Sequence, residues 1–202
     1  MSNAALSPEF WDERYQSNRT PWDFGGVPAK LREFLATPPV TGTCVLIPGC
    51  GSGYEIAAFS AAGFAVTAID ISPAAIARAR GHARAGGPRA AQIMLGDFFK
   101  HSFADEPFDC IYERTFLCAL PPERWPAIVE RTVSLLKPGG LLFGFYFFGD
   151  KEDGPPFGLA PGEDARLFGA RFELVTDALS ADALPLFAGC ERWQVRRSIP
   201  RP

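Results

Sequence analysis

Three glycines at alternate positions follow a short apolar run, and they form the first group of residues with chemical meaning. The run at 45–48 has the composition of a buried strand, and Gly49, Gly51 and Gly53 come directly after it. Glycines there let a ligand lie against bare backbone at the carboxyl end of a strand, where a β-carbon would collide with it. A tight strand-to-helix connection without a ligand would use the same pattern, so a second feature must decide.

Asp70 is that second feature. It ends the next expected strand, 64–70, and places a carboxylate at a second strand tip, within reach of ribose hydroxyls. A dinucleotide fingerprint counted from Gly49 would need its last glycine at position 54, where the chain has Tyr54. The third glycine falls at 53 instead, as in sites for nucleosides carried without a pyrophosphate. We therefore predict a nucleoside-type site.

The elements that must position this site alternate along the chain. Two short helices come first, one starting at Ser7 and Pro8 and one at 28–36, and they predict a helical cap over 1–40. The expected strands are 44–47, 64–70, 91–95, 108–113, 141–148, 172–179 and 191–199. The expected helices between them are 54–62, 72–85 and one that carries Trp125 to Leu136 on its stripe and is closed by 138–140.

This order predicts an α/β fold with a doubly wound, mostly parallel, seven-stranded sheet. The last two strands read as an antiparallel hairpin at the sheet edge, after a loop at 150–163 that is rich in proline and glycine. We find no linker and no repeat, and expect one domain over 1–202. Four arginines make the C-terminal end locally basic, and we interpret them as the solvated face of an edge strand: Arg192, Arg196, Arg197 and Arg201.

Composition excludes several classes of function. The 202 residues are 47% apolar, which fits a globular chain with a real core, and the net charge of −3 gives no general attraction to nucleic acid or anionic membranes. No apolar stretch approaches the ~20 residues of a membrane span, and the N-terminus lacks a signal-peptide pattern. The five cysteines contain no C-x-x-C pair, so we predict no metal site and reduced thiols in the cytoplasm. We expect a monomer that acts on a small molecule.

Several motifs taken together carry a resemblance to a known family. The glycine loop, Asp70, the pair Asp97 and Phe98, and the segment 136–140 resemble the S-adenosylmethionine-dependent methyltransferases of the class I, Rossmann-like type. A narrower resemblance lies in the N-terminal aromatic residues, the segment 20–23 and the segment 112–116. These are similar to the thiopurine S-methyltransferase family, which includes thiol and halide methyltransferases.

The resemblance implies a role for each of these residues. It makes S-adenosyl-L-methionine the cofactor and S-adenosyl-L-homocysteine the product, and it places Glu113 and Arg114 beside the methyl group and the substrate as catalytic residues. Arg114 matches the thiopurine branch of the family, where plant halide and thiol enzymes tend to carry tyrosine. The implied cofactor-binding residues are Trp11, Tyr15 and Trp22, folded over the cofactor, Gly49 at its methionine part, Asp70 at the ribose, Asp97 and Phe98 at the adenine, and Cys50, Gly51, Gly53 and Ile71.

The chemistry of methyl transfer favours a soft nucleophile. Transfer from a sulfonium is an in-line displacement, and a nearby aromatic face attracts the cation. The only histidines, His82 and His101, lie outside the predicted site, and no other general base is evident from the sequence. A thiol already supplies some thiolate at neutral pH. We therefore expect a thiol or thiopurine sulfur, or a selenium, tellurium or halide species, as the acceptor.

These residues also have purely structural interpretations. The N-terminal aromatic residues would also serve to pack a helix on the core, and Arg114 would also serve in a salt bridge with Asp12, Glu13 or Asp23. The side chains that could line a dry pocket, Phe116, Leu117, Phe157 and Leu159, come in part from a segment that would also serve as an ordinary surface loop.

Two other functions compete with methyl transfer. A nicotinamide-dependent oxidoreductase would use a similar sheet, although Tyr54 speaks against it. A catalytically silent sensor of S-adenosylmethionine would show an exposed apolar patch around 145–148 or at Phe187.

Overall fold

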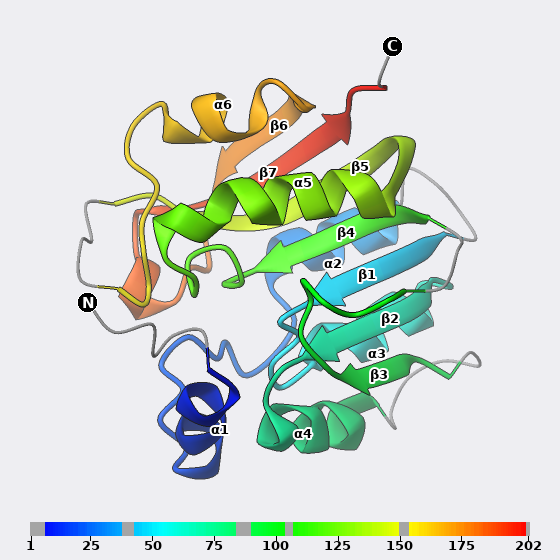
Figure 1. Cartoon of the computed structure of the whole chain (residues 1–202), viewed down its shortest axis with the longest axis vertical. Helices are drawn as coiled ribbons and strands as arrows, with labels where there is room; N and C mark the ends of the chain where they lie inside the picture. The colour runs from blue at the N-terminus through cyan, green and yellow to red at the C-terminus, as the bar shows by residue number, and fades with distance from the viewer. Residues whose placement is uncertain (1–6, 38–42, 84–89, 104–106, 150–153, 201–202) are drawn as a thin grey trace. The chain divides into compact units, whose positions relative to one another are not determined.

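The computed structural model describes residues 7–37, 43–83, 90–103, 107–149 and 154–200 (Figure 1). The contacts of the chain divide it into two compact units, Met1–Ser102 and Phe103–Pro202. Its seven strands have the order β3-β2-β1-β4-β5-β7-β6. This confirms the predicted seven-stranded, mostly parallel sheet with antiparallel C-terminal strands. The prediction of a single domain over 1–202 stays a prediction.

The first unit contains the predicted cap and three parallel strands. Its elements are α1 (Pro8–Gln16), α2 (Ala29–Ala36), β1 (Cys44–Pro48), α3 (Tyr54–Ala61), β2 (Ala65–Asp70), α4 (Pro73–Ala83) and β3 (Gln92–Leu95). Strand β2 pairs in parallel with β1 on one side and with β3 on the other. Helix α1 begins as expected, because the Ser7 side chain accepts a hydrogen bond from the Phe10 N–H at 3.2 Å and Pro8 occupies the first turn. The expected end of α4 at 85 lies outside the described residues.

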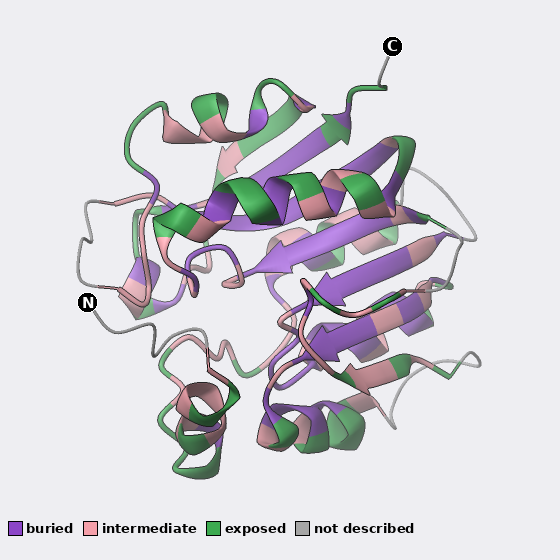
Figure 2. Cartoon of the chain, in the orientation of Figure 1, coloured by how far each residue is buried: buried purple, intermediate pink, exposed green. Residues whose placement is uncertain are grey.

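The second unit contains the remaining strands. Its elements are β4 (Phe108–Arg114), η2 (Pro122–Arg124), α5 (Trp125–Leu135), β5 (Leu136–Phe147), α6 (Glu163–Phe168), β6 (Phe172–Leu179), η3 (Pro185–Phe187) and β7 (Glu191–Ser198). Strand β5 pairs in parallel with β4 and in antiparallel with β7, and β7 pairs in antiparallel with β6. Strands β1, β2, β4, β5 and β7 are mostly buried, whereas β3 has no buried residue and β6 has one, and the helices expose one face (Figure 2).

Two boundaries of the second unit differ from the prediction. Leu136 is extended and pairs with Phe108, so α5 ends one residue before it and β5 starts before the proline–glycine segment. The cause is local, since Pro138 keeps Lys137 out of helical backbone and Leu136 is already paired. Helix α6 was not predicted: the expected loop at 150–163 overlaps only its first residue, and the helix follows Gly162, whose left-handed backbone (φ 75°) turns the chain into it.

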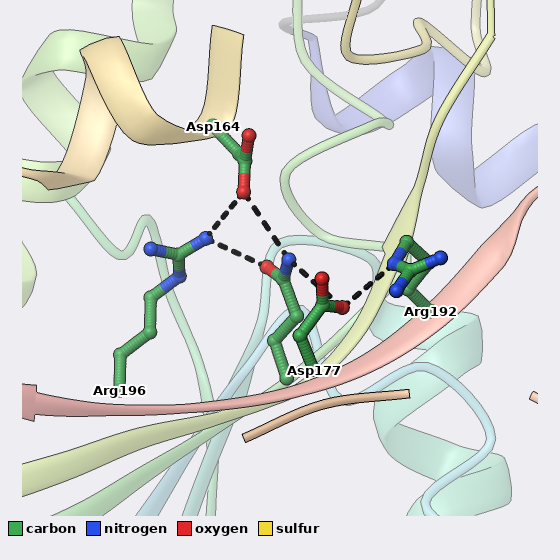
Figure 3. Close-up of polar contacts among 5 residues, drawn as sticks. Asp164, Asp177, Arg192 and Arg196 are labelled. Atoms are coloured by element: carbon green, nitrogen blue, oxygen red, sulfur yellow. Dashed lines mark hydrogen bonds and ion pairs between the residues drawn. The ribbon is translucent and has the colours of Figure 1, made fainter. Parts of the chain in front are cut away.

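The interpretation of the C-terminal arginines is wrong for Arg196. Strand β7 lies between β5 and β6, so β6 is the edge strand, and Arg196 is only 1% exposed. Its Nη2 donates to Asp164 Oδ2 on α6 at 2.9 Å and to Gln194 Oε1 at 2.8 Å (Figure 3). Gln194 Nε2 also reaches Asp164, at 3.2 Å, and the Arg196 guanidinium lies 4.5 Å from the ring centre of Phe168. This network fastens α6 to β7. Arg201 lies outside the described residues.

The positions at which a silent sensor would expose an apolar patch, 145–148 and Phe187, are not exposed, although Phe148 is only half-buried. Phe145, Tyr146, Phe147 and Phe187 are all buried, with Phe145 in contact with Trp193 and Phe147 in contact with Phe187. These rings therefore belong to the core of the second unit.

The Asp164–Arg196 pair gives a stability prediction. Asp164→Asn leaves the buried guanidinium without its counter-charge, and we expect a loss of roughly 3 kcal/mol in the free energy of unfolding, as for other broken buried pairs. The matched control is Arg166→Ala, which breaks the exposed pair between Arg166 and Glu163 on the same helix. It is expected to cost below about 1 kcal/mol. Urea unfolding monitored by circular dichroism measures both values, and equal losses would contradict the role of the buried pair.

Candidate functional site

The glycine loop in the first unit has the backbone that only glycine adopts readily. Gly49, Gly51 and Gly53 have φ values of 56°, 52° and 69°, all in the left-handed region. Gly53 also begins α3, and a β-carbon on it would lie 2.7 Å from the Ala79 side chain on α4. Cys50 is buried and its N–H donates to the Ile69 carbonyl at 3.1 Å. The loop is therefore a tight glycine turn at the carboxyl end of β1, as predicted, with Gly49 half-buried and residues 50–53 buried.

Asp70 fixes this loop to the tip of β2. Its Oδ2 accepts a hydrogen bond from the Gly51 N–H and its Oδ1 accepts one from the Ser72 N–H, both at 2.9 Å. The side chain is 8% exposed, and burial raises the pKa of its carboxyl against the opposing effect of the two N–H groups. Each carboxylate oxygen keeps a further acceptor position. Asp70 can therefore hold the loop and accept a ribose hydroxyl at the same time.

The residues expected at the adenine lie at the neighbouring strand tip. Leu95 at the end of β3 pairs with Asp70, and the Gly96 N–H donates to the Asp70 carbonyl at 2.9 Å. Asp97 Oδ1 then accepts from the Phe99 N–H at 2.8 Å, and the Phe98 ring is buried. Ile71, half-buried, directly follows Asp70. The structure thus brings these residues to adjoining strand ends.

The N-terminal aromatic residues form one cluster. The ring of Trp22 meets Trp11 edge-to-face at 5.4 Å and Tyr15 at 6.0 Å, and Trp22 Nε1 donates to the Tyr15 hydroxyl at 3.3 Å. A β-carbon on Gly51 would lie 2.7 Å from that hydroxyl, so Tyr15 touches the glycine loop. Burial, then the nearby Asp70, raises the pKa of the Tyr15 hydroxyl, which stays protonated.

Two aspartates and an arginine hold this cluster in place. The sequence analysis named Asp12 and Asp23 only as possible partners of Arg114, and it did not name Arg78. Asp12 Oδ1 accepts from the Ala74 N–H at 2.7 Å and from Ser72 Oγ at 2.8 Å, which ties α1 to the first turn of α4 and lowers the pKa of Asp12. Ser52 Oγ in the glycine loop donates to Asp23 Oδ2 at 2.5 Å. Arg78 donates to the Tyr15 carbonyl and to Asn18 Oδ1. One feature of the sequence pointed to Asp12. It lies three residues before Tyr15, so the two side chains share a face of the expected helix.

Glu113 and Arg114 end β4 in the second unit. Glu113 is 5% exposed, and its Oε1 accepts from the Phe116 N–H at 2.9 Å and the Leu117 N–H at 2.8 Å. Burial raises the pKa of Glu113 to about 7, with a further contribution from the negative charge of Glu191. Arg114 Nη2 lies 3.9 Å from Glu191 Oε1.

Within the second unit, Glu191 is an ion partner of Arg114 that the sequence analysis did not name. The three acidic residues named there have partners in the first unit. Of those, Asp12 and Asp23 hold the aromatic cluster, and Glu13 pairs with Arg19 at 2.7 Å. The Arg114 guanidinium also lies 4.4 Å from the ring centre of Phe145. Arg114 is therefore held by a carboxylate on β7 and an aromatic ring on β5.

The side chains expected to line a pocket come from two segments of the second unit, 116–117 after β4 and 157–159 after β5. Leu117 and Leu159 are buried, and Phe116 and Phe157 are half-buried. The Phe157 N–H donates to the Cys118 carbonyl at 2.7 Å, and the Leu159 N–H donates to the Phe147 carbonyl at 2.9 Å. The described part of the loop at 150–163 is therefore hydrogen-bonded to β5 and to Cys118, unlike an ordinary surface loop.

Two of the sequence expectations concern absences. Among the described residues, no group of three or more His, Cys, Asp or Glu side chains is placed to hold a metal ion. Within the same parts of the chain, no helix has both the length and the apolar character needed to cross a membrane.

His82 is exposed. Its Nδ1 lies 2.7 Å from the carbonyl of Ser52 in the glycine loop, and its ring stacks on Tyr54 at 4.2 Å.

Solved structures share this fold. The crystal structure of the 1,6-didemethyltoxoflavin-N1-methyltransferase of Burkholderia thailandensis, with bound S-adenosylhomocysteine, superposes with a TM-score of 0.78 at 19% identity, over 98% of this chain and 88% of that one. The fold is that of the Rossmann-like, class I methyltransferases.

Sequence comparison identifies the family within this class of methyltransferases. The family model described as Thiopurine S-methyltransferase (TPMT) matches residues 6–198. The chain is 31% identical over 155 residues to "Probable thiol methyltransferase 2" of Arabidopsis thaliana, covering 76% of this chain and 68% of the relative. It is 28% identical over 186 residues to the thiopurine S-methyltransferase of Pseudomonas fluorescens (strain SBW25), covering 84% and 85%. The chain belongs to the thiopurine S-methyltransferase family of S-adenosylmethionine-dependent enzymes.

The contact between Tyr15 and the glycine loop gives a second prediction. Gly51→Ala is expected to cost about 1–2 kcal/mol for left-handed alanine and a further 1–3 kcal/mol for the collision with the Tyr15 hydroxyl. Gly25→Ala is the matched control, because Gly25 has φ 71° with open space around it and meets only the first cost. Thermal unfolding measures both. Adding Tyr15→Phe to Gly51→Ala should recover part of the second cost, and no recovery would contradict the contact.

The buried carboxyl of Glu113 gives a third prediction. Its pKa rises from the ordinary 4.5 to about 7 on folding, so the folded state binds the proton more tightly than the unfolded state does. The free energy of unfolding supplied by this group is full below pH 4.5 and is lost as the pH rises through 7. The free energy of unfolding of the wild type minus that of Glu113→Gln, measured by urea unfolding at a series of pH values, should fall as the pH rises across that range, because glutamine does not titrate. A constant difference would contradict the raised pKa.

Proposed function

We propose that this enzyme transfers the methyl group of S-adenosyl-L-methionine to a small soft nucleophile of the thiol or thiopurine type, by in-line displacement, with S-adenosyl-L-homocysteine as the other product. The observation that carries the proposal is the Asp70 carboxylate, which fastens the glycine loop beneath the Tyr15 hydroxyl. That arrangement offers bare peptide, a buried acceptor for a ribose and aromatic rings within one unit. Family membership supplies the reaction class.

The residues of the first unit fit the cofactor. Asp70 would accept a hydrogen bond from the ribose, the peptide at Gly49 would meet the methionine part, and Asp97 and Phe98 would border the adenine. Cys50, Gly51, Gly53 and Ile71 complete this binding surface. The faces of Trp11, Tyr15 and Trp22 would attract the sulfonium, an effect of about 0.5–2 kcal/mol that depends on how dry the site is.

The residues of the second unit would serve the methyl acceptor. Arg114 is a fixed positive charge that can hold a sulfur with partial negative charge or polarise it through water. Glu113 is the buried acid beside it. Phe116 and Leu117 would exclude water, which favours a displacement in which charge is neutralised. The acceptor range is proposed to include thiol, thiopurine and related selenium or tellurium species. Halides are weaker candidates because Arg114 stands where tyrosine is usual in the halide branch.

The remaining expectations are part of the same proposal. The cysteines at 44, 50, 110, 118 and 190 are free thiols, which supports a reducing, cytoplasmic location. We propose a monomer with one domain over 1–202 that acts on a small molecule rather than on nucleic acid or a membrane. Membership of a methyltransferase family speaks against the oxidoreductase alternative, and the burial of Phe145 and Phe187 removes the support for a silent sensor.

A pair of variants tests the division of roles. Asp70→Ala is expected to weaken cofactor affinity by about 1.5–3 kcal/mol, because a ribose hydroxyl loses a charged partner and the glycine loop loses its clamp. Arg114→Ala should keep cofactor affinity and lower turnover or acceptor affinity. Calorimetric titration with S-adenosyl-L-homocysteine measures the first effect. Mass spectrometry of products from a panel of thiols, thiopurines, selenite, tellurite and halides measures the second.

Two outcomes would contradict the proposal. Wild-type protein that yields no methylated product from any acceptor would refute the reaction. Equal loss of cofactor affinity in both variants would refute the division of roles between Asp70 and Arg114.

A further inference from the structure

Glu113 Oε2 is one of several buried side-chain oxygens in the second unit that have no hydrogen-bond partner among the described residues. Glu113 Oε1 accepts two backbone N–H groups, whereas Glu113 Oε2 is buried and has no hydrogen-bond partner among the residues that the structure describes. A buried acceptor left in this state costs about 1–3 kcal/mol, so it marks a place where a donor from a ligand would bind favourably. The two N–H bonds at Oε1 fix the carboxyl, so Oε2 is presented in a defined position.

The ionisable groups that act on this carboxyl are all buried. Arg114 adjoins it on β4, Glu191 comes from β7, Tyr146 from β5 and Cys118 from the segment after β4. Burial raises the pKa of the Cys118 thiol and of the Tyr146 hydroxyl, so both stay neutral at physiological pH. Burial also raises the pKa of Glu191, which has the Arg114 guanidinium 3.9 Å away as its counter-ion. Glu113, with a pKa of about 7, is the group suited to exchange a proton near neutral pH.

We propose that the methyl acceptor carries a proton on its nucleophilic sulfur and that Glu113 Oε2 receives this proton. This inference rests on the proposed function and narrows it to neutral thiols and thiol-bearing heterocycles. An anion without a proton, such as thiocyanate or iodide, has nothing to donate to Oε2 and would meet a second negative charge in a buried place. The sequence could not show this, because a glutamate in water has a pKa of about 4.3 and is too weak a base for a thiol.

The S–H bond breaks, its proton moves to Glu113 Oε2, and its electron pair stays on sulfur and forms the new S–CH3 bond. The bond between the methyl carbon and the sulfonium sulfur breaks, and its electron pair goes to the departing thioether. A carboxylate and a sulfonium become a carboxylic acid and a neutral thioether, so no co-reactant is needed beyond the sulfonium donor. The proton returns to water between turnovers.

The decisive experiment compares wild type with Glu113→Gln on acceptors of different acidity. At pH 7, kcat/KM for an alkylthiol should fall by roughly 10²–10⁴-fold in Glu113→Gln, the usual contribution of a general base. The loss should shrink for an acidic aromatic thiol, which is already a thiolate. Any turnover of thiocyanate or iodide should not fall. In the wild type kcat/KM should rise with pH around 7, whereas in Glu113→Gln the rise should move to the pKa of the thiol itself, about 8.5 for one like free cysteine.

A second readout does not depend on activity. Infrared difference spectra of the protein alone should show a carboxylate appearing near pH 7 in the wild type and not in Glu113→Gln. Glu191→Gln is the matched variant, since it removes the neighbouring negative charge and should move that midpoint to lower pH. Unchanged affinity for S-adenosyl-L-homocysteine shows that each variant is folded. If Glu113→Gln fails this check, the wild-type and Glu191→Gln titrations still decide, and a wild-type midpoint below pH 5 overturns the inference.

The role of Glu113 and the proposed methyl transfer to sulfur are refuted by different results. Wild type that methylates thiols while Glu113→Gln keeps full activity at pH 7, or loses the same factor on thiols and on thiocyanate, overturns the role of Glu113 alone. Wild type that methylates no sulfur acceptor overturns the proposed function and this inference with it.

Discussion

The bond between the Asp70 carboxylate and the Gly51 N–H is the interaction on which the first unit depends. It joins the end of one parallel strand to the loop that follows its neighbour, so two strand tips act as one rigid surface. The same carboxylate holds the Ser72 N–H at the start of α4, and Ser72 Oγ in turn donates to Asp12 on α1. Helix α1, the glycine loop and α4 therefore share one chain of hydrogen bonds.

Burial of charge organises the second unit in a different way. Glu113, Arg114 and Glu191 are buried, and the Arg114 guanidinium lies 4.4 Å from the ring centre of Phe145. Burial disfavours the charged form of both carboxyls and so raises the pKa of Glu113 and of Glu191. In such surroundings a carboxyl acquires acid–base properties that its type does not have in solution. Arg196 is buried as well, but its role is structural. A guanidinium stays charged, and the Asp164 carboxylate is its counter-charge.

Local patterns were enough to predict the strands, the glycine turn and the start of α1, because apolar runs, glycine spacing and a serine–proline cap act over a few residues. Contacts between distant segments were not predictable in this way. The bond between Asp12 and the Ala74 N–H joins residues 62 positions apart, which no local pattern indicates. Arg196 reads as an exposed strand residue unless the order of β5, β7 and β6 is known. The basicity of Glu113 depends on burial, which no spacing rule supplies.

The short length of helix α1 makes it depend on contacts with other residues of the first unit. With nine residues it is shorter than the ~12–15 that an isolated helix needs to persist in water, so its shape is supplied by Asp12 and Arg78 rather than by its composition. A free peptide of these residues would be a random coil and would present no aromatic surface. Any event that severs those two anchors therefore melts the helix as a unit, and the rings of Trp11 and Tyr15 lose their common platform together.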